Sequence, residues 1–128
     1  MAIFAIGDMH LSLGTDKPMD VFPGWEGYLP RLEANWRKLI GPDDTVILAG
    51  DTSWAMNLND TKADFAFIQS LPGQKWLLKG NHDLWWSSIT RLNQMYDNMY
   101  FLQNQHYVAG KYAVCGSRGW ICPGTSDY

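Results

Sequence analysis

Three short apolar runs in this sequence share one pattern, in which a glycine and a polar residue able to bind metal or phosphate follow the run. Residues 2–6 precede Gly7-Asp8, residues 46–49 precede Gly50-Asp51, and residues 76–78 precede Lys79-Gly80-Asn81. Unbroken apolar runs, without alternation, favour strands that are covered on both faces, as in a parallel sheet. The pattern therefore predicts three buried strands, each with a polar residue at its carboxyl end.

Helical periodicity separates these predicted strands. One apolar set recurs near the helical period and stops at Gly41-Pro42, a typical helix exit: Leu29, Leu32, Trp36 and Leu39. A second set follows Asn59 or Asp60, either of which could be the cap, and ends at Pro72-Gly73: Ala63, Ala66, Phe67 and Leu71. The order strand, helix, strand, helix, strand predicts an α/β fold, a parallel βαβαβ sheet with flanking helices and right-handed crossovers.

The rest of the chain contains a third helical pattern and three shorter strand-like stretches. Trp85, Ile89, Leu92 and Tyr96 carry the helical pattern. The stretches are residues 100–102, 106–109 and 112–115, with turn signals at Asn104 and Gly110-Lys111. Residues 11–27 form a longer irregular loop directly after the first polar cluster, and loops of that length often shape a functional site.

Polar residues are expected to converge at one edge of the predicted sheet. Ligands of open α/β sheets bind beyond the carboxyl ends of the strands, where Asp8, Asp51 and Asn81 should lie. His10 points to the same side as Asp8 if the chain stays extended there, and His82-Asp83 adds a titratable pair. Two carboxylates, an imidazole and an amide oxygen suit Mn, Fe, Zn or a similar divalent ion, whereas the absence of thiols argues against a structural zinc site.

Each of these residues also has an ordinary structural explanation. A single Asp after a strand is usually a turn or a helix cap, and Asn81, His82 and Asp83 could simply cap the third helix. A single His is more often a surface or core residue than a ligand. The functional interpretation depends on finding all of them together, in this order and at equivalent strand ends.

The residues of the three clusters resemble the sequence motifs of the calcineurin-like metallophosphoesterases. Gly7-Asp8-Met9-His10, Gly50-Asp51 and Gly80-Asn81-His82-Asp83 match the family's GDxH, GD and GNHD motifs in order. The surrounding residues look like a group of uncharacterised bacterial members. They do not look like the protein serine/threonine phosphatases, which carry an acid and then Arg where this chain has Trp54 and Ala55.

The resemblance implies a two-metal hydrolase of phosphate mono- or diesters. Asp8 and His10 would hold the first divalent ion, Asp51 would bridge both, and Asn81 would bind the second and steady the phosphate. The metal pair would activate a hydroxide that attacks phosphorus. His82 would be the general acid at the leaving oxygen, with Asp83 at best in a supporting role and the residue that orients His82 left open.

The resemblance covers the amino-terminal motifs only. The family completes its site with further histidines, including a GHxH motif, and nothing in these 128 residues matches them. His106 lacks the neighbouring glycine and second histidine and is assigned to structure. We therefore expect a partial domain over residues 1–128, the amino-terminal half of the family's αββα sandwich. The alternative is a catalytically incompetent fragment, poor in metal and prone to form homo-oligomers.

Composition limits the other function classes. A formal net charge of −3 without a basic stripe argues against non-specific nucleic-acid binding. The apolar start is too short for a signal peptide and no membrane span is predicted, so a cytoplasmic location is expected. Cys115 and Cys122 lack CxxC spacing and are expected to be buried free thiols. A nucleotide-binding doubly wound domain is disfavoured because no GxGxxG or GxxxxGK[ST] motif follows the first strand, and the substrate stays open.

Overall fold

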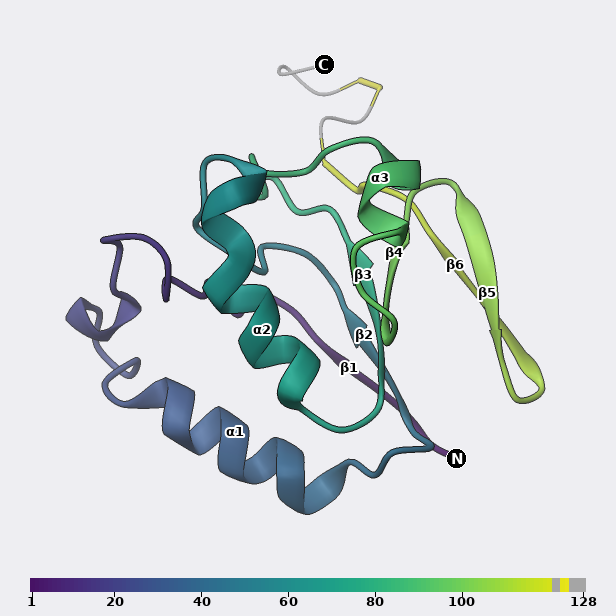
Figure 1. Ribbon diagram of the computed structural model, residues 1–128, viewed down its shortest axis with the longest axis horizontal. Helices are drawn as coiled ribbons and strands as arrows, with labels where there is room; N and C mark the ends of the chain where they lie inside the picture. The colour runs from purple at the N-terminus through teal and green to yellow at the C-terminus, as the bar shows by residue number, and fades with distance from the viewer. Residues whose placement is uncertain (121–122, 125–128) are drawn as a thin grey trace.

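The structure is a computed structural model that describes residues 1–120 and 123–124. A four-stranded parallel sheet forms the centre of the molecule (Figure 1). Its strands β1 (Ile3–Ile6), β2 (Thr45–Leu48), β3 (Gln74–Leu78) and β4 (Met99–Leu102) pair in chain order. This arrangement confirms the predicted parallel α/β fold. It also gives the strand predicted at residues 100–102 a partner, because β4 extends the sheet parallel to β3.

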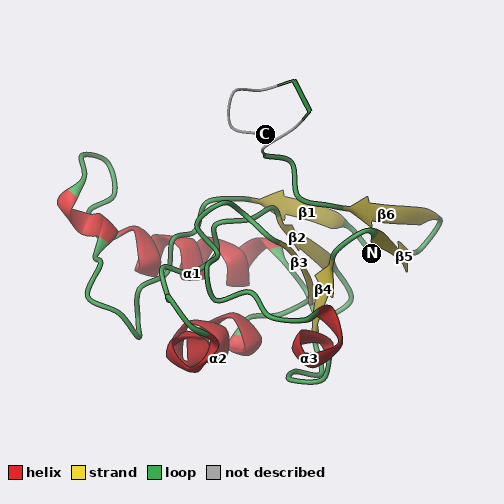
Figure 2. Ribbon diagram, turned by 90° about the horizontal axis from the view of Figure 1, so that it is seen from above, coloured by secondary structure: helices red, strands yellow, loops and turns green. Residues whose placement is uncertain are grey.

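Three helices cover one face of the sheet (Figure 2). They are α1 (Tyr28–Leu39), α2 (Lys62–Ser70) and α3 (Ile89–Asn93), with short 3-10 turns η1 (Met19–Val21) and η2 (Leu58–Thr61) before the first two. The core between the layers centres on Phe65, which is fully buried and packs edge-on against the Trp85 and Phe101 rings. None of the helices in the described ranges is long and apolar enough to cross a membrane.

The buried face of α2 differs from the prediction. Asp64, Phe65 and Ile68 are buried, whereas Ala63 and Ala66 are exposed. The apolar pattern did not predict this face because one of its buried residues is a carboxylate. Asp64 accepts hydrogen bonds from the Leu13 backbone N–H (2.8 Å) and the Ser53 hydroxyl (2.5 Å). The cap was also misplaced, because Asn57 accepts from the Asp60 N–H at the start of η2.

The third helix is shorter than predicted. It begins at Ile89, where the Ser88 hydroxyl accepts from the Arg91 N–H, and it excludes both Trp85 and Tyr96. Trp85 lies in the turn before the helix and is buried in the core, where its indole N–H donates to Asp83. The apolar spacing therefore predicted the burial of Trp85 correctly, but Trp85 lies in a turn and not in the helix.

The hairpin of β5 (Gln105–Ala109) and β6 (Tyr112–Gly116) forms a separate antiparallel pair, which packs against Trp76 and Leu102 of the sheet. Asn104 and Gly110 mark its turns with positive φ angles, as predicted. Cys115 is exposed, so its predicted burial is wrong; it pairs across the hairpin with His106, which is exposed as well. Cys122 lies outside the described residues.

Lys75 of β3 is fully buried, and its ammonium group donates to the Leu71 carbonyl. Burial, with a smaller contribution from Arg37, lowers its pKa from 10.5 to about 8. Between these two pKa values the folded chain binds fewer protons than the unfolded chain, so Lys75 makes the free energy of unfolding rise with pH from about 8 to 10.5.

We expect Lys75→Met to remove this rise and to increase the free energy of unfolding near neutral pH by about 1–3 kcal/mol, because the buried charge is lost. Urea denaturation of both proteins between neutral pH and the alkaline end of this window measures the effect. Lys62→Met, at an exposed position of α2, is the matched control and should follow the wild-type pH dependence. An unchanged pH slope in Lys75→Met would contradict the assignment.

Candidate metal centre

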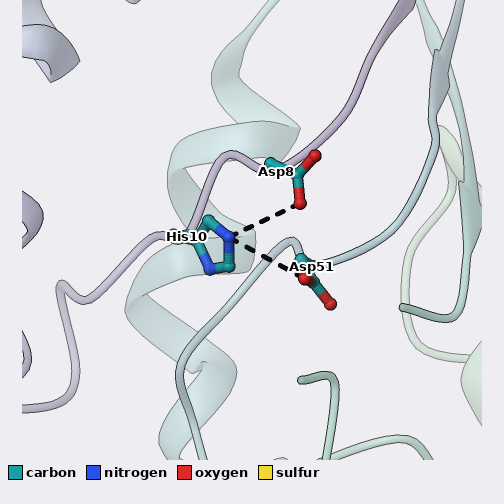
Figure 3. A group of neighbouring side chains, drawn as sticks. All are labelled: Asp8, His10 and Asp51. Atoms are coloured by element: carbon teal, nitrogen blue, oxygen red, sulfur yellow. Dashed lines mark ion pairs between the residues drawn. The ribbon is translucent and has the colours of Figure 1, made fainter. Parts of the chain in front are cut away.

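Asp8, His10 and Asp51 form a compact cluster on the loops that leave β1 and β2 (Figure 3). One ligand atom from each lies within 4.8 Å of the others. The His10 Nε2 atom is 3.5 Å from Asp8 Oδ1 and 3.8 Å from Asp51 Oδ2. The Asp8 side chain is 73% exposed, whereas those of His10 and Asp51 are 12% and 10% exposed, so the cluster opens to solvent on one side.

Hydrogen bonds hold the two loops side by side beyond the ends of their strands. The Asp8 N–H donates to the Gly50 carbonyl (3.0 Å) and the His10 N–H donates to the Asp51 carbonyl (2.9 Å). Asp8, His10 and Asp51 have φ angles of 57°, 47° and 52°, in the left-handed region that non-glycine residues rarely adopt. Such conformations cost free energy, persist where the surroundings enforce them, and concentrate at functional sites.

Two glycines allow the β2 and β3 loops to touch. Gly50 has a φ of 117°, and a Cβ atom there would lie 2.9 Å from the Gly80 Cα. A Cβ atom at Gly80 would collide with the backbone nitrogen and the Oδ1 atom of Asp51. Gly7 is different, because a Cβ atom there would make only an ordinary 3.5 Å contact with Ala49. Close approach of the backbone therefore requires glycine in the second and third clusters, but not in the first.

The close approach of these loops places Asn81 against Asp51. With its NH₂ group turned toward Asp51, the Asn81 amide donates to the two carboxylate oxygens at 3.2 and 3.1 Å. The opposite rotation would direct the amide oxygen to the same place, where it would join those oxygens around a cation. The donor types fit divalent ions: an N/O set from Asp8, His10 and Asp51, and an oxygen pair from Asp51 and Asn81.

His82 lies at the same edge of the sheet, opposite an aromatic side chain. Its backbone N–H donates to Asp51 Oδ1 (2.8 Å), and its exposed imidazole centroid is 6.1 Å from that of His10 and 5.0 Å from the Trp54 ring. Trp54 also stacks on His10, at 4.8 Å and 27°. Within residues 1–120 and 123–124, no carboxylate pairs with the His82 imidazole. The neighbours of this candidate acid there are the Trp54 and His10 rings.

The irregular loop predicted at residues 11–27 contributes to the same site. Its Trp25 ring meets His10 edge-on at 6.2 Å and Tyr28 at 4.9 Å. The Tyr28 hydroxyl donates to the His10 carbonyl (3.2 Å), and burial chiefly raises the pKa of Tyr28 to about 12, which keeps the hydroxyl a donor. The loop therefore forms one wall around the His10 side chain.

Asp83 fixes the backbone geometry of the loops that carry the cluster, from their buried side. It is fully buried and accepts hydrogen bonds from the backbone N–H groups of Gly80 (2.7 Å), Asp51 (2.8 Å), Thr52 (2.9 Å) and Ser53 (3.4 Å), and from the Trp85 indole (3.0 Å). Burial raises the pKa of Asp83, and these hydrogen bonds oppose the shift. Asp83 was expected to have at best a supporting role beside His82, and its hydrogen bonds to the backbone of both loops could not be predicted from its place next to that histidine.

We expect Asp83→Asn to destabilise the fold by about 2–4 kcal/mol, because an amide NH₂ replaces an oxygen that faces several buried donors. Metal affinity should fall roughly 10–100-fold, the range found when a group that orients metal ligands is lost. Denaturant unfolding and metal titration by calorimetry measure the two effects. Asp97→Asn, at an exposed position, is the control. Unchanged stability and metal affinity in Asp83→Asn would refute a positioning role.

A cavity of about 220 Å³ opens beside the carboxylates. Its walls include six residues from the strand ends and from the segment after β6: Asp8, Asp51, Lys79, Asn81, Ser117 and Trp120. The structure therefore brings together every residue predicted for the site, namely Asp8, His10, Asp51, Asn81 and His82. It adds Trp25 and Trp54 as residues that contact them, and it places Asp83, the supporting candidate, beneath the backbone of the β2 and β3 loops.

The protein combines a parallel α/β sheet with a cluster of nitrogen and oxygen ligands beyond the carboxyl ends of the strands. These two features make it a candidate metalloprotein. The sequence model of the calcineurin-like phosphoesterase family matches residues 1–125, and the chain belongs to this family, as its motifs indicated. A crystal structure of a protein of unknown function from Aquifex aeolicus is similar, with 25% identity and a TM-score of 0.55. The match covers 84% of this chain but only 54% of the Aquifex chain. No curated protein matches the chain.

Proposed function

We propose that the protein hydrolyses phosphate mono- or diesters with the help of two divalent metal ions. The observation that supports this function is the meeting of Asp8, His10, Asp51 and Asn81 at one sheet edge, with three of them held in left-handed backbone conformations. Membership of the calcineurin-like phosphoesterase family favours the same chemistry. Because the match spans only 54% of the Aquifex chain, the activity is inferred for the protein of which this chain carries the described site.

In this proposal Asp8 and His10 hold one ion, Asp51 is shared, and Asn81 serves the second ion and the phosphate. When bound, the ions supply Lewis acidity, which makes water more acidic and neutralises charge on the phosphoryl oxygens. Asp51 would suit the shared position because it lies between the other ligands: its Oδ2 is 3.8 Å from His10 Nε2, and the Asn81 amide lies 3.2 and 3.1 Å from its two oxygens. Asp51 Oδ1 also accepts a hydrogen bond from the His82 N–H. That hydrogen bond also links the ligand to the candidate acid.

His82 is the proposed general acid. Its imidazole is exposed, lies at the rim of the cluster, and is the side chain that most often serves as a general acid or base. Trp54 stands where the protein serine/threonine phosphatases carry an acid. Since the Trp54 ring lies 4.8 Å from His10 and 5.0 Å from His82, we propose that it fixes both imidazoles by packing.

The second candidate is a chain of 128 residues that folds and binds metal weakly but does not turn over substrate alone. It is favoured by the ligand count, because the described residues offer a single cluster of three titratable ligands with Asn81 beside it. Each ion would then depend on water, or on residues outside this chain, for the rest of its coordination. This view retains the partial domain expected from the sequence.

Metal titration and a phosphatase assay on the same sample test the proposal. We expect hydrolysis of phenyl phosphate or a bis-aryl phosphate diester once Mn²⁺ is added, with loss of activity after chelation by EDTA. Weak binding of one ion without turnover would favour the incompetent chain. A chain that turned over esters at full rate in EDTA would contradict a metal-dependent function.

A further inference from the structure

Two cations lie on one aromatic ring at the side of the metal cluster. The Lys79 ammonium is 5.9 Å from the centroid of the Trp120 ring, and the Arg118 guanidinium carbon is 5.3 Å from it. Lys79 follows β3 and precedes Gly80-Asn81, whereas Arg118 and Trp120 follow β6. Segments from opposite parts of the chain therefore bring positive charge next to the candidate ligands.

Lys79 lines the same cavity as the metal ligands, and Arg118 lines the cavity next to it. The cavity of about 220 Å³ has Asp8, Asp51 and Asn81 on its walls together with Lys79 and Trp120. A second cavity of about 160 Å³ shares Lys79 with the first and extends along Gln103 to Arg118. A substrate with its reacting phosphate at Asp51 thus has a second cavity within reach, with Lys79 and Arg118 among its lining residues.

Neither cation has an acidic partner in the part of the chain that the structure describes. The ion pair that an arginine does form there joins Arg37 to Glu33, and it lies far from this site along the sequence. Two like charges attracted to the same ring repel each other, and an anion between them would remove that repulsion. The guanidinium fork suits the planar or tetrahedral oxygens of carboxylate and phosphate.

We propose that Lys79 and Arg118 bind a second anionic group of the substrate, a phosphate or a carboxylate. The preferred substrates are then phosphate esters that carry another anionic group beyond the one that is hydrolysed. This inference rests on the proposed function for the reacting phosphate. Trp120 serves as the platform that holds both cations, and occupation of its ring by Lys79 and Arg118 disfavours a stacked aromatic base as the alternative ligand.

Binding of non-hydrolysable phosphonates tests the inference independently of catalysis. Propylphosphonate carries one anionic group, phosphonobutyrate adds a carboxylate, and trimethylenebisphosphonate adds a second phosphonate on the same spacer. We expect the Mn²⁺-loaded protein to bind at least one doubly anionic ligand roughly tenfold or more tightly than propylphosphonate, as charge-assisted hydrogen bonds allow. Calorimetry, with a ligand-into-Mn²⁺ blank, measures the affinities. The better of the two ligands identifies the second group.

Lys79→Gln, Arg118→Gln and the double variant should remove this preference, measured as the ratio of the affinity for the doubly anionic ligand to the affinity for propylphosphonate. Lys62→Gln and Arg91→Gln, at exposed positions on α2 and α3, are the charge-matched controls and should keep it. Circular dichroism verifies that each variant is folded. Equal affinity for all three ligands, or a preference that survives in the folded double variant, would overturn the inference.

The outcomes separate this inference from the proposed function. Ester turnover without any preference for a doubly anionic ligand would leave the phosphoesterase function standing and reject the role of Lys79 and Arg118. A preference that depends on Lys79 and Arg118, in a protein without turnover, would support the anion site and count against the proposed function for this chain.

Discussion

Asp51→Asn should abolish phosphoesterase activity in any form of the protein that is active with metal. The substitution removes the negative charge that is proposed to be shared by two cations. It preserves the shape of the side chain, and the amide oxygen can still accept the hydrogen bond from the His82 N–H that Asp51 Oδ1 receives at 2.8 Å. The effect therefore isolates charge from packing. Steady-state rates and metal titration by calorimetry should both show the loss.

Asp43→Asn provides the matched control, because Asp43 is exposed and lies in the turn before β2, at the opposite end of that strand from Asp51. It should retain wild-type rates and metal affinity. An Asp51→Asn protein that binds two ions with wild-type affinity and retains activity would exclude Asp51 as the shared ligand. Thermal unfolding without metal should show that both variants are folded.

His82→Ala should slow turnover by roughly 10²–10⁴-fold, the usual range for loss of a general acid. The loss should be smaller for aryl phosphates than for alkyl phosphates, because a good leaving group needs little protonation. The structure adds a condition: the ring of His82 lies on Trp54, and the backbone N–H that contacts Asp51 survives the substitution. Metal affinity should therefore change little.

His106→Ala is the histidine control, because His106 is exposed on β5, and it should leave rates unchanged. The decisive comparison is the ratio of the losses on phenyl and ethyl phosphate. Equal losses on the two esters would argue against proton donation by His82. A large fall in metal affinity would instead point to a ligand or packing role.

The strands and the polar residues after them could be predicted from the sequence because both follow local rules. A buried parallel strand needs an unbroken apolar run, and its carboxyl end is where ligands of such sheets bind. Residues 2–6, 46–49 and 76–78 therefore mark β1, β2 and β3 to within a few residues. Asp8, Asp51 and Asn81 meet because these strands are parallel and adjacent.

The positioning residues could not be predicted in the same way, since their roles depend on contacts between distant segments. Asp83 binds backbone groups about thirty residues away, and Asp64 supports a loop fifty-one residues away. Both are carboxylates that local patterns assign to surface or site. The stacking of Trp54 on His10 likewise depends on two loops that meet only in the folded chain.

The left-handed backbone at Asp8, His10 and Asp51 bears on how this sequence can change during evolution. Glycine would relieve the steric cost at each of these positions, because it has no Cβ atom. Selection for stability alone would therefore favour replacement of the candidate ligands by glycine, while retention of the three side chains requires selection on their chemistry. In a copy of the gene that is freed from that requirement, these positions should acquire Gly.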